Sequence, residues 1–205
     1  MGTKFGNVHV MTNELEAVLS ALKDMTSAEN GSAEQAALER MPGFGHLLLE
    51  VAKRKNIFYI AEWKPGWITI LNDCFGWGET EAFGETLSGY IGSPVFTFSY
   101  FDDDVFEMNV FANGETLTGH GWQSLYADYE MEEKSADVGV LSELLGHEHV
   151  GRLLNVLETD NPEQAAEQFE SILQIPIWIH SDWFDDLAGD ETIRKYTKYD
   201  FNRAG

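Results

Sequence analysis

Hydrophobic and polar positions alternate with two different periods along the chain, and the clearest patterns lie between Trp67 and Trp122. Residues 67–71 are rich in β-branched and aromatic side chains and follow a Pro-Gly pair, which predicts a buried strand. Between residues 79 and 91 the hydrophobic side chains recur at helical spacing. Acidic residues gather near the beginning of that segment, where the helix dipole favours them. We therefore expect a strand followed by an amphipathic helix.

Two further strands and a tight turn follow in the same stretch. Residues 95–101 and residues 106–111 each alternate with period two, and the three aspartates at 102–104 separate them. The pair Asn113-Gly114 is typical of a type I′ turn, because both central residues of that turn need a positive φ. Residues 115–119 are then predicted to pair back as a third, shorter strand. This order predicts an antiparallel meander.

The residues before Trp67 predict a strand, several helical segments and a second strand. Residues 7–11 alternate as a short strand, and a stripe of apolar side chains over residues 15–22 predicts the first helix. Residues 25–32 are polar and predict a loop, and two helical segments are expected between residues 33 and 55. Residues 57–62 are predicted to form a hairpin with the strand that begins at Trp67.

Helical periodicity predominates after Trp122. Two short helices are expected between residues 138 and 157, and the sequence Asn161-Pro162-Glu163 marks the start of another. The order of elements therefore predicts an α+β fold: an antiparallel sheet with N-terminal helices, one inserted helix and a helical C-terminal part. At 205 residues we expect a single domain, with the sheet at about 1–127, helices at about 128–190 and a basic tail at 191–205. We expect that tail to lie across the acidic surface of the protein.

Composition and charge restrict the possible partners. No apolar run approaches the about 18 residues that cross a bilayer, and residues 1–10 lack a signal pattern. The single cysteine, Cys74, suits a reducing compartment, so we expect a cytoplasmic protein. Thirty-five acidic against thirteen basic residues give a net charge of −22, which disfavours nucleic acids and anionic membranes. Besides solubility, such a charge favours docking on a basic protein partner.

The candidate interaction residues are acidic and aromatic. Asp102, Asp103 and Asp104 could bind a hard cation, but calcium loops place their ligands at alternate positions with a glycine bend, so we favour a charged hairpin turn that serves as an interaction surface. Trp77 and Trp122 stand next to glycines and are the aromatic candidates for the same surface or for a pocket. The simpler alternative is that these glycines belong to loops and that the tryptophans close the core.

The histidines carry a second hypothesis, a small-molecule or metal-dependent enzyme that uses His120, His147 and His149. On a helix, positions i and i+2 point about 200° apart, so His147 and His149 can hold one metal ion only if the segment is extended or forms a loop. A nucleophilic Cys74 would need a histidine beside it in space. The sequence contains no phosphate-binding or nucleophile-elbow motif, so we predict no cofactor, no metal and no catalytic residue.

The succession of residues 7–10, the strand at 67–70, the run from Val95 into the aspartates at 102–104, and Asn113-Gly114 resembles a diffuse group of uncharacterised bacterial cytoplasmic proteins. Some members of such acidic α+β groups look like immunity proteins of toxin systems. The resemblance implies that the protein inhibits a partner by surface binding, and it supplies no catalytic residue. A third hypothesis is an assembly or scaffold subunit, including a homo-oligomer, which would need a large apolar surface patch.

Overall fold

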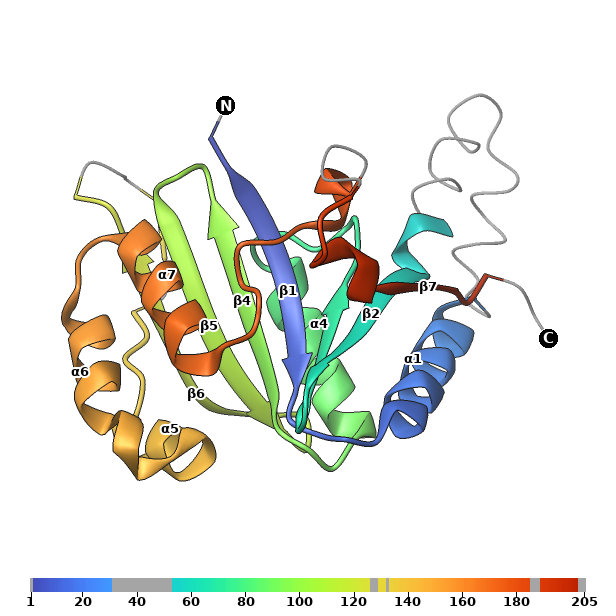
Figure 1. Cartoon of the computed structure of the whole chain (residues 1–205), viewed down its shortest axis with the longest axis horizontal. Coiled ribbons are helices and arrows are strands. Elements are labelled where there is room, and N and C mark those ends of the chain that lie inside the picture. Colours follow the sequence, from blue (N-terminus) through green and yellow to red (C-terminus); the bar gives the residue numbers. More distant parts are fainter. Residues whose placement is uncertain (1, 31–52, 126–128, 132, 185–188, 203–205) are drawn as a thin grey trace.

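The computed structural model describes residues 2–30, 53–125, 129–131, 133–184 and 189–202 (Figure 1). The strands are β1 (Lys4–Val10), β2 (Ile57–Lys64), β3 (Trp67–Leu71), β4 (Val95–Phe101), β5 (Val105–Ala112), β6 (Glu115–Gln123) and β7 (Thr197–Asp200). The helices are α1 (Leu15–Asn30), α4 (Glu79–Tyr90), α5 (Val138–Leu145), α6 (Val150–Glu158) and α7 (Pro162–Leu173). Short 3₁₀ turns are η1 (His147–His149), η2 (Ser181–Trp183) and η3 (Ile193–Lys195).

All seven strands form one antiparallel sheet in the order β6-β5-β4-β1-β3-β2-β7. The four strands β4-β1-β3-β2, with α1 after β1 and α4 after β3, have the β-α-β-β-α-β arrangement of ferredoxin-like domains. Strands β5 and β6 extend this unit at the β4 edge as a meander, and β7 extends it at the β2 edge. The predicted α+β class and antiparallel sheet are confirmed. An arrangement of this kind serves many functions and identifies none.

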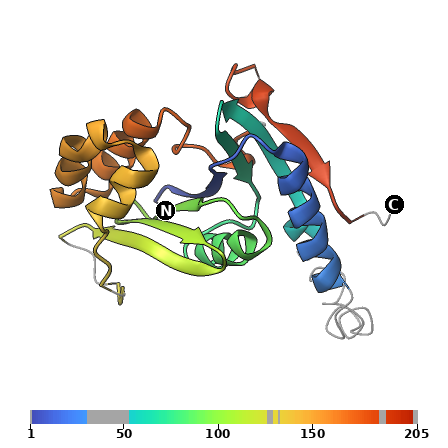
Figure 2. The ribbon, with the colours of Figure 1, turned by 90° about the horizontal axis from the view of Figure 1, so that it is seen from below.

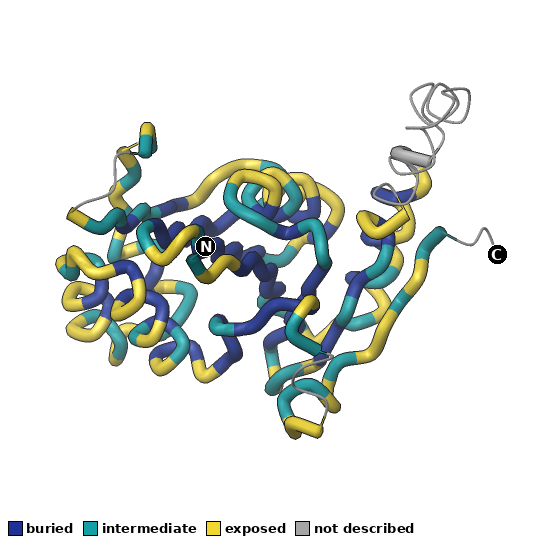
Figure 3. Tube along the Cα trace, turned by 90° about the horizontal axis from the view of Figure 1, so that it is seen from above, coloured by how far each residue is buried: buried dark blue, intermediate teal, exposed yellow. Residues whose placement is uncertain are grey.

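Helices cover both faces of the sheet (Figures 1 and 2). On one face, Val8 and Val10 of β1 belong to a core with residues of α1 and α4, including Leu22 and Leu87. The other face carries aromatic side chains of β4 and β5 that pack against α5, α6 and α7, with Phe169 of α7 fully buried among them. Because side chains alternate along a strand, the side chains on both faces of β1, β3, β4 and β5 enter a core. These four strands are accordingly buried along most of their length, whereas the helices expose their outer sides (Figure 3).

Several local signals produce the expected geometry. Asn113 and Gly114 have φ values of 55° and 77°, as a type I′ turn requires. Helix α7 begins after Asn161, whose Oδ1 accepts a hydrogen bond of 2.9 Å from the N–H of Gln164, with Pro162 as the first helical residue. The hairpin of β2 and β3 and the helical residues 53–55 also match the sequence predictions.

Three predictions were wrong in their boundaries. Helix α1 continues to Asn30 instead of ending before residue 25, because Met25 is buried and continues the apolar stripe of the helix. Strand β6 runs to Gln123, so residues 120–123 belong to the sheet and not to a loop. Strand β1 begins at Lys4. The helical segments predicted within 33–52 lie outside the described residues.

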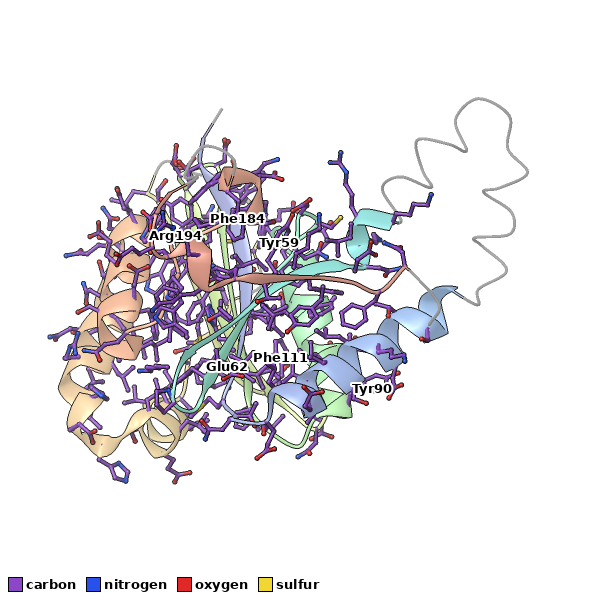
Figure 4. All side chains as sticks on the ribbon, turned by 45° about the vertical axis from the view of Figure 1, so that its right-hand side comes forward. Tyr59, Glu62, Tyr90, Phe111, Phe184 and Arg194 are labelled. Carbon is purple, nitrogen blue, oxygen red and sulfur yellow. The ribbon has the colours of Figure 1, made fainter. Side chains whose placement is uncertain are left out.

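Residues 197–200 of the basic C-terminal segment are part of the sheet. Residues 197–200 pair with residues 57–60 of β2, and Tyr199 and Phe201 pack against the core of the α1 face. Tyr59 of β2 lies beside Phe184, with ring centroids 4.9 Å apart (Figure 4). This segment therefore completes an edge of the sheet. In the ranges described above, no helix is both long and apolar enough to cross a membrane.

Candidate interaction surface

The three aspartates form the turn between β4 and β5, and their carboxylates bind the chain around them. Backbone N–H groups of residues 2 and 3 donate to Asp102 Oδ1 and Asp103 Oδ1, each at 2.9 Å. Ser124 Oγ donates to Asp104 Oδ1 at 2.5 Å. Asp102 and Asp103 have φ values of 56° and 65°, and both are exposed. The turn therefore ties the start of β1 and the end of β6 to the β4–β5 hairpin.

Trp77 lies next to this turn, as the sequence prediction required for a common surface. Its ring centroid is 5.4 Å from that of Phe101 and 5.6 Å from that of Tyr129, which meets it edge-on. The Tyr129 hydroxyl in turn donates to Asp102 Oδ2 at 3.2 Å. All three aromatic side chains are half-buried. We call Trp77, Phe101, Asp102, Asp103 and Tyr129 the Trp77 surface.

A buried carboxylate holds the Trp77 indole. Trp77 Nε1 donates to Glu107 Oε2 at 2.5 Å, and Glu107 is only 4% exposed. Burial raises the pKa of Glu107, while the positive charge of Lys134, whose Nζ lies 3.6 Å from Glu107 Oε1, lowers it. Lys134 also pairs with Glu81 at 2.6 Å. The Trp77 indole is thus held in place by a charged cluster of Glu107 from β5, Glu81 from α4 and Lys134 from the segment after β6.

Two glycines in β6 make room for neighbouring side chains. A Cβ atom on Gly121 would lie 2.9 Å from Met131 Cε, and one on Gly119 would lie 2.5 Å from Asn109 Oδ1. Because Gly121 lacks a side chain, Met131 of the segment after β6 can lie directly against the sheet, and Gly119 leaves space for the Asn109 side chain of β5. The glycines around His120 therefore serve the opposite face of the strand from the histidine. Sequence reasoning noticed them but missed Tyr129 and Glu107.

Trp122, the other predicted aromatic, does not join this surface. It is 2% exposed in the α5–α7 core, and its Nε1 donates to the carbonyl of Val156 at 3.0 Å. Trp122 lies in the same strand as Gly121 but points to the other face, since side chains alternate. Its position fits the simpler alternative, a tryptophan that closes the core.

The three histidines of the enzyme hypothesis lie on two elements, His120 in β6 and the other two in η1. His120 packs on Trp122 with ring centroids 4.3 Å apart, and its Nδ1 accepts the N–H of Ala136 at 3.3 Å. Burial lowers the pKa of His120. His147 is exposed in η1, and His149 lines a small cavity of about 90 Å³ beside Lys64. Within the described part of the chain, no three histidine, cysteine or acidic residues are grouped so that they could hold a metal ion.

Cys74 lies on the wall of a cavity of about 280 Å³ between α1, β2 and α4. The lining is mainly apolar and includes Phe58, Phe75 and Phe83. Burial raises the pKa of the Cys74 thiol, which keeps it protonated and disfavours the thiolate that a nucleophile needs. The amide of Asn72 in the lining donates to backbone carbonyls, so its hydrogen bonds are made within the protein.

Large apolar side chains that are exposed come from four different parts of the described chain. They are Tyr90 of α4, which Figure 4 labels, Leu117 of β6, Leu125 after β6, and Leu154 of α6. Single exposed hydrophobic residues are normal on a protein surface. They give the assembly hypothesis no specific support.

Comparison with known proteins adds no functional assignment. No family profile matches the chain, and no curated protein or solved structure is significantly similar to it. The functional argument therefore depends on the geometry alone.

Proposed function

We propose that this protein acts by binding a basic protein partner through the Trp77 surface. The observation that carries the proposal is the double contact of Tyr129, which touches the Trp77 ring and donates a hydrogen bond to Asp102. Aromatic anchors beside charged groups are typical of protein interfaces, where the rings supply buried area and the charges select the partner. Residues 77, 101–103 and 129 combine these two components.

The charge of the protein supports a basic partner. The net charge is −22, and Asp102 and Asp103 add exposed carboxylates directly beside the aromatic rings. Hydrogen bonding from the N–H of Gly2 lowers the pKa of Asp102, so this carboxylate stays ionised near neutral pH. Complementary charge would increase the association rate and reject acidic proteins, and added salt would weaken both effects.

Inhibition by surface binding is the biological role that we propose for this contact, in the manner of an immunity protein that covers a toxin. The fixed geometry of the surface supports this role. Trp77 is held by Glu107, and the neighbouring turn is held by the hydrogen bonds of its own carboxylates. A side chain that is already fixed in position loses little conformational entropy on binding.

Affinity capture from the cells of origin tests the proposal. The bait is the whole chain, and the variant Asp102→Asn plus Asp103→Asn removes two charges but keeps the oxygen atoms that accept backbone hydrogen bonds. Capture is compared at low and high salt. We expect a basic protein that the parent chain retains at low salt, that high salt releases, and that this variant retains at least about tenfold less well.

The matched control is Glu14→Gln plus Glu16→Gln, which removes two exposed charges at the opposite end of β1. It should retain the partner like the parent chain, because only the net charge changes. Equal retention by the Asp102/Asp103 variant and the parent would contradict the proposed surface. Equal loss in both variants would show that net charge, and not this surface, selects the partner.

A further inference from the structure

A further hollow lies on the α7 face of the sheet, away from the Trp77 surface. Its volume is about 560 Å³, and it lies between α7, the segment after α7 and the end of β2. Trp63 and Trp178 contribute aromatic walls, Glu167 and Glu170 line it from α7, and Gln174 lines it from the residue after the helix. Glu167 and Glu170 are three residues apart, so they share one side of the helix.

The hollow combines an aromatic ring that already contacts a cation with carboxylates that form no ion pair among the described residues. Lys195 Nζ lies 3.9 Å from the centre of the Trp63 ring, where the negative face of the ring attracts it. In the part of the chain that the structure describes, neither Glu167 nor Glu170 forms an ion pair. Lys195 itself does not line the hollow.

Glu170 also has capacity to bind a ligand. Its Oε2 accepts hydrogen bonds from the N–H groups of Ile177 at 2.8 Å and Trp178 at 2.9 Å. The described residues donate no hydrogen bond to its other oxygen. Two described basic side chains donate to α7: Arg152 donates to Ser171 Oγ at 2.8 Å, and Lys64 donates to the carbonyl of Leu173. Among the described residues, neither forms an ion pair with Glu167 or Glu170.

We propose that this hollow binds an organic cation, a guanidinium or alkylammonium group, between Trp63, Glu167 and Glu170. The carboxylates supply the opposite charge, and the tryptophan supplies a flat face on which a weakly hydrated cation stacks. The cation can belong to a free amine or to an arginine or lysine side chain of a peptide. The proposal does not depend on the Trp77 surface, which uses other residues on the other face of the sheet.

The test is a titration followed by ¹H–¹⁵N NMR of the tryptophan indole N–H groups. The probes are agmatine as a free cation, acetyl-Gly-Arg-Gly-amide as a peptide, and acetyl-Gly-Gln-Gly-amide as a neutral control. We expect saturable shifts of the Trp63 and Trp178 signals with both cations and none with the neutral peptide. Tighter binding of the peptide would identify a peptide side chain as the ligand, and tighter binding of agmatine would identify a free amine.

Matched variants on α7 make the test specific. Glu167→Gln should weaken binding of the cation about tenfold, because a charge-assisted contact is replaced by a neutral one. Glu170→Gln should act in the same direction and still accept the two backbone hydrogen bonds. The control Glu163→Gln changes an exposed glutamate of the same helix that does not line the hollow, so its affinity should be unchanged.

Two results would overturn the proposal. One is the absence of saturable shifts with either cation. The other is an affinity for the cations that Glu167→Gln and Glu170→Gln leave unchanged. Variants of the Trp77 surface should bind the cations normally, so failure of one site can be distinguished from failure of the other.

Discussion

A polar cluster is buried on each face of the sheet, and the two clusters differ in charge and in access to solvent. On the α7 face, His9 is fully buried, with Nε2 at 2.8 Å from Asn7 Oδ1 and Nδ1 at 3.0 Å from Thr69 Oγ1. On the α4 face, the ionisable pair Glu107 and Lys134 lies under an indole. The first cluster is neutral and closed, and the second is charged and open on one side.

The closed cluster serves the fold. Asn7 Nδ2 donates to the carbonyl of Ile177 at 2.7 Å, so the group joins β1, β3 and the segment after α7. Since Asn7 Oδ1 is an acceptor, His9 Nε2 carries the proton and His9 Nδ1 accepts from the Thr69 hydroxyl. Every polar atom named here has a partner. A buried polar group with this many partners specifies packing and offers nothing to a ligand.

The open cluster instead holds side chains that reach the surface. Glu107 orients Trp77, and the ring of Trp77 contacts Tyr129, which binds the exposed Asp102. The comparison teaches that burial of a polar residue does not by itself indicate a structural or a functional role. A structural role is indicated when the residue contacts only other buried groups. A functional role is indicated when the residue holds side chains that reach solvent.

The largest expected effect is on the closed face, in the aromatic core beside His9. Phe98 is fully buried, packs on His9 with ring centroids 5.6 Å apart and lies 5.7 Å from Phe169. Phe98→Ala should reduce the free energy of unfolding by about 3–5 kcal/mol, because a cavity replaces the ring. Urea titration measures the change. A loss below about 1 kcal/mol would show that this face is not the main core.

The closed cluster should also make stability depend on pH. Burial lowers the pKa of His9 from 6.5 to about 3. The contribution of His9 to the free energy of unfolding is therefore complete above about pH 6.5 and is lost as the pH falls towards 3. In that pH range the histidine of the unfolded chain binds a proton, whereas the buried histidine of the folded chain does not. Between pH 7 and pH 4.5 the loss should be about 2–3 kcal/mol.

Urea titrations of the parent chain and of His9→Gln at both pH values isolate this contribution from that of the many carboxylates. The variant should lose less stability than the parent on acidification. An equal loss in both proteins would mean that His9 takes up a proton in the folded state, and the closed cluster would then be open to water.

In the open cluster, loss of the hydrogen bond to Trp77 should reduce stability more than loss of the Glu107 charge. Glu107→Ala leaves the Trp77 N–H without its acceptor and should cost about 1–3 kcal/mol, whereas Glu107→Gln keeps an acceptor and should cost less. Because burial raises the pKa of Glu107, the ionised form is disfavoured in the fold, which further reduces the cost of a neutral amide. Urea titration and the Trp77 indole signal check both variants. Equal losses would show that the charge pairing with Lys134 is the main stabilising interaction.

Local signals made most of the elements predictable. The strand at 67–71, the Asn113-Gly114 turn and the Asn161 cap depend on neighbouring residues, and the structure matches them. The position of β1 between β3 and β4 depends on pairing between distant segments, which periodicity does not encode. The contact of Trp77 with Tyr129 could not be predicted for the same reason, because Tyr129 lies 52 positions later in the chain.

The alternation of polar and apolar residues along the strands also did not show whether one face of the sheet or both faces are buried. Asn7 and His9 alternate with Val8 and Val10, a pattern typical of a strand with one solvated face. Helices cover both faces of this sheet, so the polar half of β1 is buried as well. Asp102 and its neighbours were correctly predicted to form a turn. Their hydrogen bonds to residues 2, 3 and 124 could not be predicted, because those partners lie far away in sequence.

The smallest expected effect on folding, and the sharpest on binding, concerns the aspartate turn. Replacing Asp102, Asp103 and Asp104 together by asparagine keeps the acceptor oxygens for the N–H groups of residues 2 and 3 and for Ser124, so the urea midpoint should stay unchanged. Asparagine also tolerates the positive φ values of 56° and 65° at the first two positions.

Replacement of the same three residues by lysine removes both charge and acceptors, and it should lower the urea midpoint as well as partner affinity. The asparagine variant should lose only partner affinity, because the turn remains while the negative charge is gone. Titration against the captured partner separates these effects. If the asparagine variant binds the partner as tightly as the parent, the turn ties strands together like the closed cluster on the other face, and its acidity plays no part in recognition.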